Sequence, residues 1–264
     1  MKRENPYTPG VAGPPPVLAG RDEELQQFDE LSNRLAEGRH IHQETILYGP
    51  RGNGKTTLLH KVTEKLETSP QIKPVFVQAP IIGTPDRLHR KLLGESPPSQ
   101  QMETTRVRGN LGPLGTSVGG ALETSEMTET TPEDREERCI AAMNDKPVLL
   151  MIDEAQRITG ETLAAILSLT DAARRGKTKF AVIFSGTPGL PEHLKRQDAT
   201  YLERAQSIRM ERLDEESTRT ALFQPFEEAG YKNRLNASDE SRLIEQTQRY
   251  PHFIQCLLCD LGCS

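Results

Sequence analysis

The clearest chemical signal in this sequence of 264 residues lies at positions 49–57. The stretch follows the pattern G-x-x-x-x-G-K-[ST] and reads Gly49-Pro50-Arg51-Gly52-Asn53-Gly54-Lys55-Thr56-Thr57. Glycines in such a loop let successive backbone N–H groups converge on phosphate oxygens, and the start of the following helix adds positive partial charge. In this arrangement Lys55 reaches the terminal phosphates and the Thr56 hydroxyl binds Mg²⁺. The pattern therefore predicts that residues 49–57 bind the phosphates of a nucleotide.

A pair of carboxylates, Asp153 and Glu154, follows the apolar run at 148–152. In a parallel sheet, a carboxylate at the C-terminal end of a strand points toward the phosphate loop of a neighbouring strand, where ligands gather. We therefore expect Asp153 to bind Mg²⁺, directly or through water, and Glu154 to orient or deprotonate an attacking water. The alternative is that the two residues only cap a helix. Together with the phosphate loop, the pair indicates nucleotide hydrolysis.

Two further polar residues, Ser185 and Thr187, lie at the end of another apolar run. They are candidates to hydrogen-bond the γ-phosphate or the attacking water, although a turn without function would have the same sequence. Phosphoryl transfer also commonly uses a further cation, often an arginine delivered by a neighbouring subunit. The candidates for that role are Arg204, Arg174 and Arg175.

The elements that must position these residues are strands that alternate with helices. Strands are expected at 45–48, 74–79, 148–152, 179–185 and 208–210, and helices at 21–38, 55–66, 133–143, 161–174 and after Pro191. That order is typical of a parallel α/β sheet. From residue 214 onward the periodicity predicts only helices, at 217–229, 238–248 and 251–261. We therefore expect a parallel-sheet P-loop NTPase core, of the α/β class, followed by a small all-helical lid.

Two stretches lack the periodicity of regular elements. Residues 1–20 are rich in proline, which fixes φ and removes a backbone donor, so they predict an extended arm along the surface. Residues 96–134 are rich in Ser, Thr, Gly, Pro, Gln and Glu, which predicts a flexible insertion. The expected organisation is an arm at 1–20, a core at 21–212 that contains the insertion, and a helical lid at 213–264.

Composition and charge exclude several classes of protein. Basic and acidic side chains number 33 and 38, and the formal charge of −5 has the wrong sign for a domain that coats nucleic acid non-specifically. The apolar runs are far shorter than the roughly 20 residues that span a bilayer, and no apolar signal segment is recognisable. The four cysteines do not suggest a disulfide framework. We therefore expect a cytoplasmic protein with free thiols and no membrane partner.

One cluster near the end of the sequence has the residue types of a metal site. His252, Cys256, Cys259 and Cys263 are spaced by four, three and four residues, which places them on one face of a helix. A single straight helix cannot surround zinc tetrahedrally. A packing face of small residues is therefore the expected role of this cluster, with a metal site as the alternative.

Taken together, these residues resemble the AAA+ and related P-loop ATPases whose acidic strand ends in Asp-Glu. The likeness is greatest to bacterial ATP-binding proteins similar to origin-licensing ATPases. Residues 5–21 resemble the N-terminal segment of that family, in which a Gly-Arg turn, here Gly20 and Arg21, lies near the adenine. Three later stretches resemble the first sensor region, the Ala-Glu-Arg segment and part of the helical lid, and these are 185–187, 201–204 and 249–255.

The resemblance implies Mg²⁺-dependent ATP binding and hydrolysis, with the nucleotide state coupled to movement of the lid. It also implies self-association or a protein partner, and DNA as a partner. Family members commonly continue into a winged-helix DNA-binding region, whereas this sequence ends at Ser264 after the lid helix, so DNA rests on the resemblance alone. Two other functions stay open. They are an ATP-gated signalling or scaffold module with negligible turnover, and a truncated remnant without its DNA-binding output domain.

Overall fold

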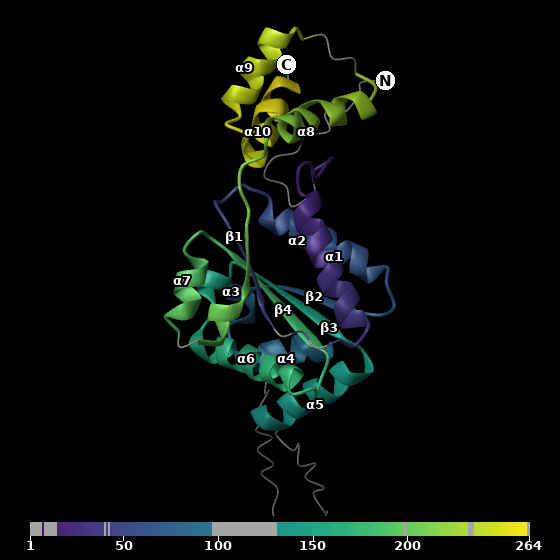
Figure 1. Ribbon diagram of the computed structural model, residues 1–264, viewed down its shortest axis with the longest axis vertical. Helices are drawn as coiled ribbons and strands as arrows, with labels where there is room; N and C mark the ends of the chain where they lie inside the picture. Colours follow the sequence, from purple (N-terminus) through teal and green to yellow (C-terminus); the bar gives the residue numbers. More distant parts are fainter. Residues whose placement is uncertain are drawn as a thin grey trace, which may run out of the picture.

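The computed structural model describes Tyr7 and residues 15–39, 41, 43–96, 131–197, 200–231 and 235–262. A sheet flanked by helices forms the larger part, which we call the sheet domain (Figure 1). A smaller group of helices lies beyond the C-terminal ends of the strands, and we call it the helical region. It consists of α8 (Glu215–Glu228), α9 (Ala237–Gln246) and α10 (Pro251–Gly262).

The described strands form one sheet, in which all neighbours are parallel and the order is β2-β3-β4-β1-β5. They are β1 (Thr45–Tyr48), β2 (Lys73–Gln78), β3 (Val148–Asp153), β4 (Phe180–Gly186) and β5 (Gln206–Arg209). The strands predicted from the sequence are confirmed, with small differences at their ends. Because β4 lies between β3 and β1, the C-terminal ends of these three strands meet at one edge of the sheet.

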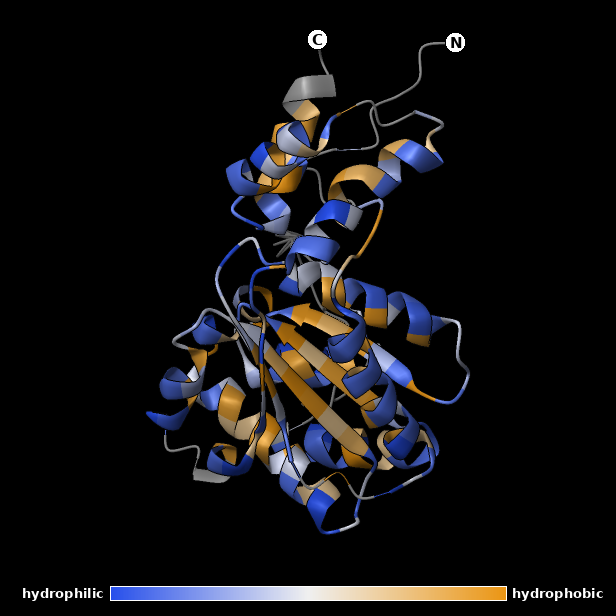
Figure 2. Cartoon of the chain, turned by 45° about the horizontal axis from the view of Figure 1, so that its top comes forward, coloured by the Kyte–Doolittle hydropathy of each residue, from blue (hydrophilic) through white to orange (hydrophobic). Residues whose placement is uncertain are grey.

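Helices cover both faces of the sheet, because its strands are apolar on both sides. One face packs against α1 (Asp22–Ala36) and α2 (Lys55–Glu67), and the other against α3 (Ala79–Ile82), α4 (Pro85–Leu93), α5 (Pro132–Asp145), α6 (Gly160–Arg174) and α7 (Leu190–Lys195). Strand β3 shows the alternation: Leu149 and Met151 belong to the first apolar cluster, whereas Leu150 and Ile152 belong to the second. Figure 2 shows the apolar strands enclosed by these helices.

The helical region has a small core of its own. Apolar side chains from its helices and from the chain just before them form this core, namely Leu213, Leu222, Ile244, Ile254 and Leu258. Tyr7 is buried among them, with its ring centroid 5.0 Å from that of Phe226 and its hydroxyl 3.0 Å from the carbonyl oxygen of Leu222. The expectation that the N-terminal arm lies along the surface is therefore wrong at Tyr7, because an aromatic ring gains more by burial than by exposure.

Between β2 and β3 the structure differs from the sequence expectation in two ways. Helices α3 and α4 were not predicted. Helix α5 begins at Pro132, because Thr131 and Asp134 form a reciprocal capping box at its first turn. The insertion predicted at 96–134 therefore extends too far at its end, and residues 97–130 lie outside the described part of the chain.

Neither a membrane-spanning helix nor a cluster of His, Cys, Asp or Glu side chains suited to a metal occurs among the described residues. No helix in the described ranges is long and apolar enough to cross a membrane. Among these residues there is also no group of three or more His, Cys, Asp or Glu side chains placed to hold a metal ion. On α10, Cys256 Sγ lies 3.7 Å from His252 Nε2, and Cys256 and Cys259 are both half-buried. Cys263 lies outside the described residues.

Candidate nucleotide site

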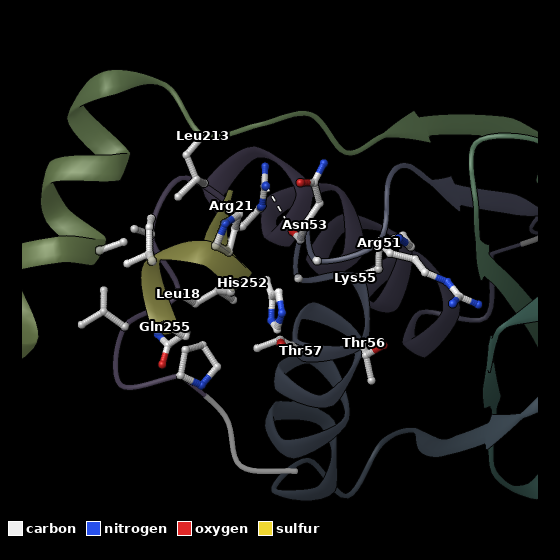
Figure 3. A pocket seen from close by; sticks show the side chains of 18 of the residues that line it. Leu18, Arg21, Arg51, Asn53, Lys55, Thr56, Thr57, Leu213, His252 and Gln255 are labelled. Carbon is white, nitrogen blue, oxygen red and sulfur yellow. Dashed lines mark hydrogen bonds between the residues drawn. The ribbon is translucent and has the colours of Figure 1, made fainter. Parts of the chain in front are cut away.

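A pocket of about 530 Å³ lies between the sheet domain and the helical region. Its lining combines residues from the N-terminal segment 15–21, the phosphate loop and start of α2 at 51–57, and α10, together with Glu154 and Arg157 after β3. Figure 3 shows that the side chains of these segments surround one space. The pocket therefore lies where the topology predicts that ligands gather, at the C-terminal ends of parallel strands.

Glycines give the phosphate loop its shape. Gly52 and Gly54 have φ angles of 84° and 85°, in the left-handed region that glycine adopts without strain. A Cβ atom at Gly49 would lie 2.5 Å from the carbonyl oxygen of Met210, so the loop packs directly on the chain after β5. Gly54 precedes the first residue of α2, and the unpaired N–H groups of that helix terminus attract anions.

Lys55 is a buried cation at the start of α2. Its Nζ donates hydrogen bonds to the carbonyl oxygens of Gly49 and Pro50, each at 2.8 Å. Burial lowers the pKa of the Lys55 ammonium group, and the negative charges of Asp153 and Glu154 oppose that shift. Gly49 and Pro50 thus contact Lys55 through their carbonyl groups, and neither is among the residues that line the pocket.

Asp153 lies beside Thr56, which lines the pocket, whereas Asp153 itself is not among the lining residues. The Thr56 hydroxyl donates to Asp153 Oδ2 at 2.6 Å, and Asp153 is almost fully buried at the end of β3. A hydroxyl and a carboxylate are hard oxygen donors of the kind that Mg²⁺ prefers, and Mg²⁺ typically completes its shell with water and phosphate oxygens. The donor set therefore fits Mg²⁺.

Glu154 lines the pocket from the turn after β3. Its φ of 53° and ψ of 37° are left-handed, a conformation that costs an L-residue about 1–2 kcal/mol. Glu154 Oε2 lies 2.5 Å from Nε2 of Gln156 and 3.7 Å from Nη2 of Arg51. Sequence reasoning named Arg51 and missed Gln156, although its position two residues after Glu154 was a signal that it lies close by.

Residues at the end of β4 contact Asp153 and Gln156 outside the pocket. The Ser185 side chain is fully buried and donates to Asp153 Oδ1 at 3.0 Å. Thr187 donates its backbone N–H to Oε1 of Gln156 at 3.3 Å. Neither Ser185 nor Thr187 is among the residues that line the pocket, so a direct contact of either with phosphate or water stays a prediction.

Arg21 connects the N-terminal segment to the phosphate loop. Its guanidinium is buried and donates to the carbonyl oxygen of Asn53 at 3.2 Å and to that of Glu211 at 2.8 Å. Burial lowers the pKa of Arg21, and the carboxylate of Glu24 opposes this shift. Asn53 in turn donates its side-chain amide to the carbonyl oxygen of Met210 at 3.1 Å. These bonds hold the loop against the chain that leads into the helical region.

The helical region closes the pocket opposite the loop. The backbone N–H of His252 donates to the carbonyl oxygen of Gly52 at 3.2 Å, and His252 and Gln255 both line the pocket. Gly20, with a φ of 62°, packs so closely on the start of α8 that a Cβ atom there would lie 2.4 Å from Ser217 Oγ. Gly20 is not among the lining residues, so it acts at the contact between the segment and α8.

The three arginines considered for phosphoryl transfer in a neighbouring subunit lie away from this pocket. Arg204 is exposed and ends a short 3-10 helix just before β5. It therefore lies at the N-terminal end of β5, whereas the phosphate loop follows the C-terminal end of the parallel neighbour β1. Arg174 and Arg175 lie at the end of α6 and form ion pairs there within the chain. A role in phosphoryl transfer for any of the three would therefore need the pocket of a neighbouring chain. Arg157, which the sequence reasoning missed, lines the pocket itself.

Comparison with known proteins agrees with this geometry. The sequence model of the AAA domain family matches residues 42–194, which is more than half of the chain. The chain belongs to the AAA domain family. No curated protein matches its sequence significantly.

Solved structures share the fold of this AAA domain protein. The ORC2 protein of Aeropyrum pernix, solved as ADPNP-ADP complexes, has a TM-score of 0.61 and 16% identity, and the match covers 95% of this chain and 64% of the other. Cdc6p from Pyrobaculum aerophilum has a TM-score of 0.63 and 17% identity, with 94% and 62% covered. The RuvB Holliday junction branch migration motor of Thermotoga maritima has a TM-score of 0.54 and 12% identity, with 91% and 61% covered.

These likenesses confirm the predicted fold, which is an AAA+ P-loop sheet with helical C-terminal segments. At identities this low they show the fold alone. The chain spans about three fifths of the length of the solved structures it matches.

Proposed function

We propose that this chain is an Mg²⁺-dependent ATPase in which the nucleotide state controls the position of the helical region. The observation that carries the proposal is that Lys55, Thr56 and Glu154 line one pocket, and that Thr56 is hydrogen-bonded there to the carboxylate of Asp153. Membership of the AAA domain family and the fold shared with a protein solved as ADPNP-ADP complexes support a nucleotide as the ligand.

In the proposed mechanism each of these side chains has its own task. The N–H groups of the loop and of the start of α2 bind phosphate oxygens, and Lys55 exchanges its two carbonyl contacts for a charge-assisted bond to the terminal phosphate. Thr56 and Asp153 would hold Mg²⁺, which neutralises charge on the phosphates when it is bound. Glu154 accepts a proton from the attacking water.

The base is proposed to bind at the other end of the pocket. Figure 3 places Leu18 and Leu213 at the end away from Thr56, and both residues line the pocket. Apolar side chains suit the faces of a purine ring, and the family membership favours adenine. His252 and Gln255 of α10 also line the pocket, so a bound nucleotide would contact the sheet domain and the helical region at once.

Movement of the helical region follows from how it contacts the loop. The hydrogen bond from His252 to Gly52 joins α10 directly to the segment that binds phosphate. A ligand that binds both sides stabilises the closed arrangement, and removal of the terminal phosphate weakens it by the difference in contacts between the two nucleotides. The proposal therefore couples hydrolysis to opening of α10.

Further partners belong to the same proposal. Arg204 is exposed and could reach the pocket of a second copy of the chain. There Arg204 would supply the positive charge that phosphoryl transfer uses. The Aeropyrum pernix ORC1 protein, with a TM-score of 0.57 to this chain, has been solved in complex with DNA. DNA as a partner of this chain is an extension of that likeness and is tested by adding DNA to the hydrolysis assay.

A second candidate function is an ATP-gated module with negligible turnover. The observation that favours it is the double contact of Glu154 Oε2, with Gln156 on one side and Arg51 on the other. A carboxylate that two donors already engage is a poor base until a ligand or partner releases it.

Phosphate release from Mg·ATP tests the proposal and separates it from the second candidate. Lys55→Ala should abolish both ATP binding and hydrolysis, because in the proposed mechanism Lys55 makes the charge-assisted bond to the terminal phosphate. Glu154→Gln should retain ATP binding and lose hydrolysis by about 100-fold or more. Lys61→Ala is the matched control, since Lys61 is on the same helix and forms an ion pair with solvent-exposed Glu64 at 3.0 Å.

The outcomes are distinct. Turnover in the wild type and in Lys61→Ala, with loss in the two site variants, supports the ATPase. Tight ATP binding without turnover supports the second candidate. Equal phosphate release by the wild type, Lys55→Ala and Glu154→Gln would overturn the enzyme proposal.

A further inference from the structure

The amide of Gln156 joins two parts of the site that the sequence places far apart. Its Nε2 donates to Oε2 of Glu154 at 2.5 Å, and its Oε1 accepts the backbone N–H of Thr187 at 3.3 Å. Because one nitrogen and one oxygen are both used, the amide can satisfy the two contacts in only one orientation. Gln156 therefore fixes the Glu154 carboxylate relative to the end of β4.

The backbone at Gly186 is shaped to admit this side chain. A Cβ atom at Gly186 would lie 2.3 Å from Oε1 of Gln156, a separation that no real contact permits. The carbonyl oxygen of Gly186 also accepts the N–H of Gly49, at 3.2 Å, where the phosphate loop begins. A continuous series of contacts thus runs from Glu154 through Gln156 and Gly186 to the loop.

The other contact of Glu154 is of a different kind. Arg51 Nη2 lies 3.7 Å from the same Oε2 atom, and the Arg51 side chain is 79% exposed. An exposed pair at this distance holds its partners weakly, because water competes and the long side chain has many rotamers. Of the two donors, Gln156 is the one whose position the fold determines, since its other end is bonded to the backbone.

We propose that Gln156 is the positioning residue for Glu154: it orients the carboxylate toward the water that attacks the terminal phosphate and aligns it with the end of β4. The inference rests on the proposed ATPase function and adds to it a residue that acts through another. Gln156 acts on the rate of the chemical step and leaves ATP affinity unchanged, because it touches the carboxylate and not the pocket.

The test combines two substitutions at Gln156 with a matched control. Gln156→Glu keeps an acceptor for the Thr187 N–H but sets a second carboxylate against Glu154. Gln156→Ala removes both contacts. Gln26→Glu is the control, because Gln26 makes the same type of bond, to Glu30 at 2.9 Å, on the exposed face of α1.

Steady-state ATP hydrolysis is measured for each variant, with ATP affinity measured separately by equilibrium dialysis. Gln156→Ala should lower kcat on the order of 100-fold, as expected for a misplaced catalytic group, while KM and ATP affinity stay close to those of the wild type. Gln156→Glu should also lower kcat at unchanged ATP affinity, because the second carboxylate repels that of Glu154 and displaces it. Gln26→Glu should leave kcat unchanged.

Each result decides between roles. Loss of kcat with unchanged ATP affinity in both Gln156 variants supports positioning. Unchanged or increased kcat in both Gln156 variants, or a loss of kcat that parallels a loss of ATP affinity, overturns the inference while the ATPase proposal stands. A wild-type chain that binds ATP without turnover overturns both proposals.

Discussion

The sheet domain and the helical region both line one pocket, and they are built differently. In the sheet domain two apolar clusters lie on the two faces of the strands, and side chains at the centre of β3, such as Leu150, are completely buried. The helical region has one small cluster, and a member of it, Tyr7, comes from the other end of the sequence. The core of the sheet domain is therefore much larger than that of the helical region.

That difference matches what each end of the pocket has to do. In the proposed mechanism Lys55, Thr56 and Asp153 keep fixed distances for phosphoryl transfer, and they belong to a helix and a strand of the well-packed sheet. The base end of the proposed mechanism encloses a ring, a task that tolerates more movement of the residues of α10 that line the pocket. The predictions below test whether the two parts respond separately.

The largest effect is expected in the centre of the sheet. Leu150→Ala should lower the free energy of unfolding by about 2–5 kcal/mol, because a fully buried leucine leaves a cavity between two layers. Urea denaturation measures this loss, and it should appear in the sheet domain and the helical region together. Ile81→Ala is the control, since Ile81 on α3 is 67% exposed. Equal losses in the two variants would contradict the description of the core.

A smaller and more local effect is expected at the contact between the N-terminal segment and α8. Gly20→Ala should destabilise this contact by about 1–2 kcal/mol, because φ is 62° and the new Cβ would lie 2.4 Å from Ser217 Oγ. Hydrogen exchange should become faster in α8–α10 and stay unchanged in the strands. Gly160→Ala is the matched control, since among the described residues a Cβ there would meet no atom within 4 Å apart from its chain neighbours and the backbone of its own helix. Faster exchange in the strands would show that the two parts unfold as one.

The next effect concerns the arm that reaches into the helical region. Tyr7→Phe should reduce the stability of that region by about 1 kcal/mol, because the ring stays and the buried hydroxyl bond to the carbonyl of Leu222 is lost. Tyr231→Phe is a close control: its ring also contacts Phe226, at 5.7 Å, but it is 37% exposed. Hydrogen exchange of α8 measures both. The same change in each variant would remove any special role for the Tyr7 hydroxyl.

The smallest effect is a pH dependence that belongs to the sheet domain alone. His89 on α4 is buried, and neither ring nitrogen has a hydrogen-bond partner among the described residues. Burial lowers the pKa of His89 below its ordinary 6.5, and the charge of Glu136 opposes the shift. Because the folded-state pKa is the lower one, the unfolded chain takes up a proton first, and stability falls as the pH drops below about 6.5.

His89→Leu should therefore flatten the dependence of the unfolding free energy on pH between about pH 7.5 and pH 5.5. Urea denaturation at several pH values measures the slope. His60→Leu is the control, because His60 is exposed on α2. If both variants keep the slope of the wild type, His89 does not carry the acid sensitivity.

The sheet and the loop at residues 49–57 could be predicted from the sequence because both depend on patterns of residues that are adjacent in the chain. The apolar run at 148–152 has no helical period, and the pattern at 49–57 has a fixed spacing, so neither needs tertiary information. Helix α4 was missed because its buried leucines, Leu88 and Leu92, are too few and too close to a proline-containing stretch to show a period. Tyr7 was missed because a single aromatic among prolines gives no pattern.

Contacts between distant segments were beyond the reach of the sequence for a physical reason. Gln156 meets Thr187 only because β3 and β4 are neighbours in register, and Arg21 meets Glu211 only because β5 lies beside β1. Such contacts depend on strand order, which local residue patterns do not specify. For Arg204 the sequence context suggested a place at the site, but the residue lies at the N-terminal end of β5, away from the pocket.

Hydrogen exchange with saturating Mg²⁺ and ADPNP shows whether one nucleotide binds both parts of the pocket. Exchange should become slower in residues 49–57 and 251–258 together, with the strands unchanged and no such change in Lys55→Ala. Unchanged exchange in both segments of the wild type, or equal protection in Lys55→Ala, would show that no nucleotide connects the two parts.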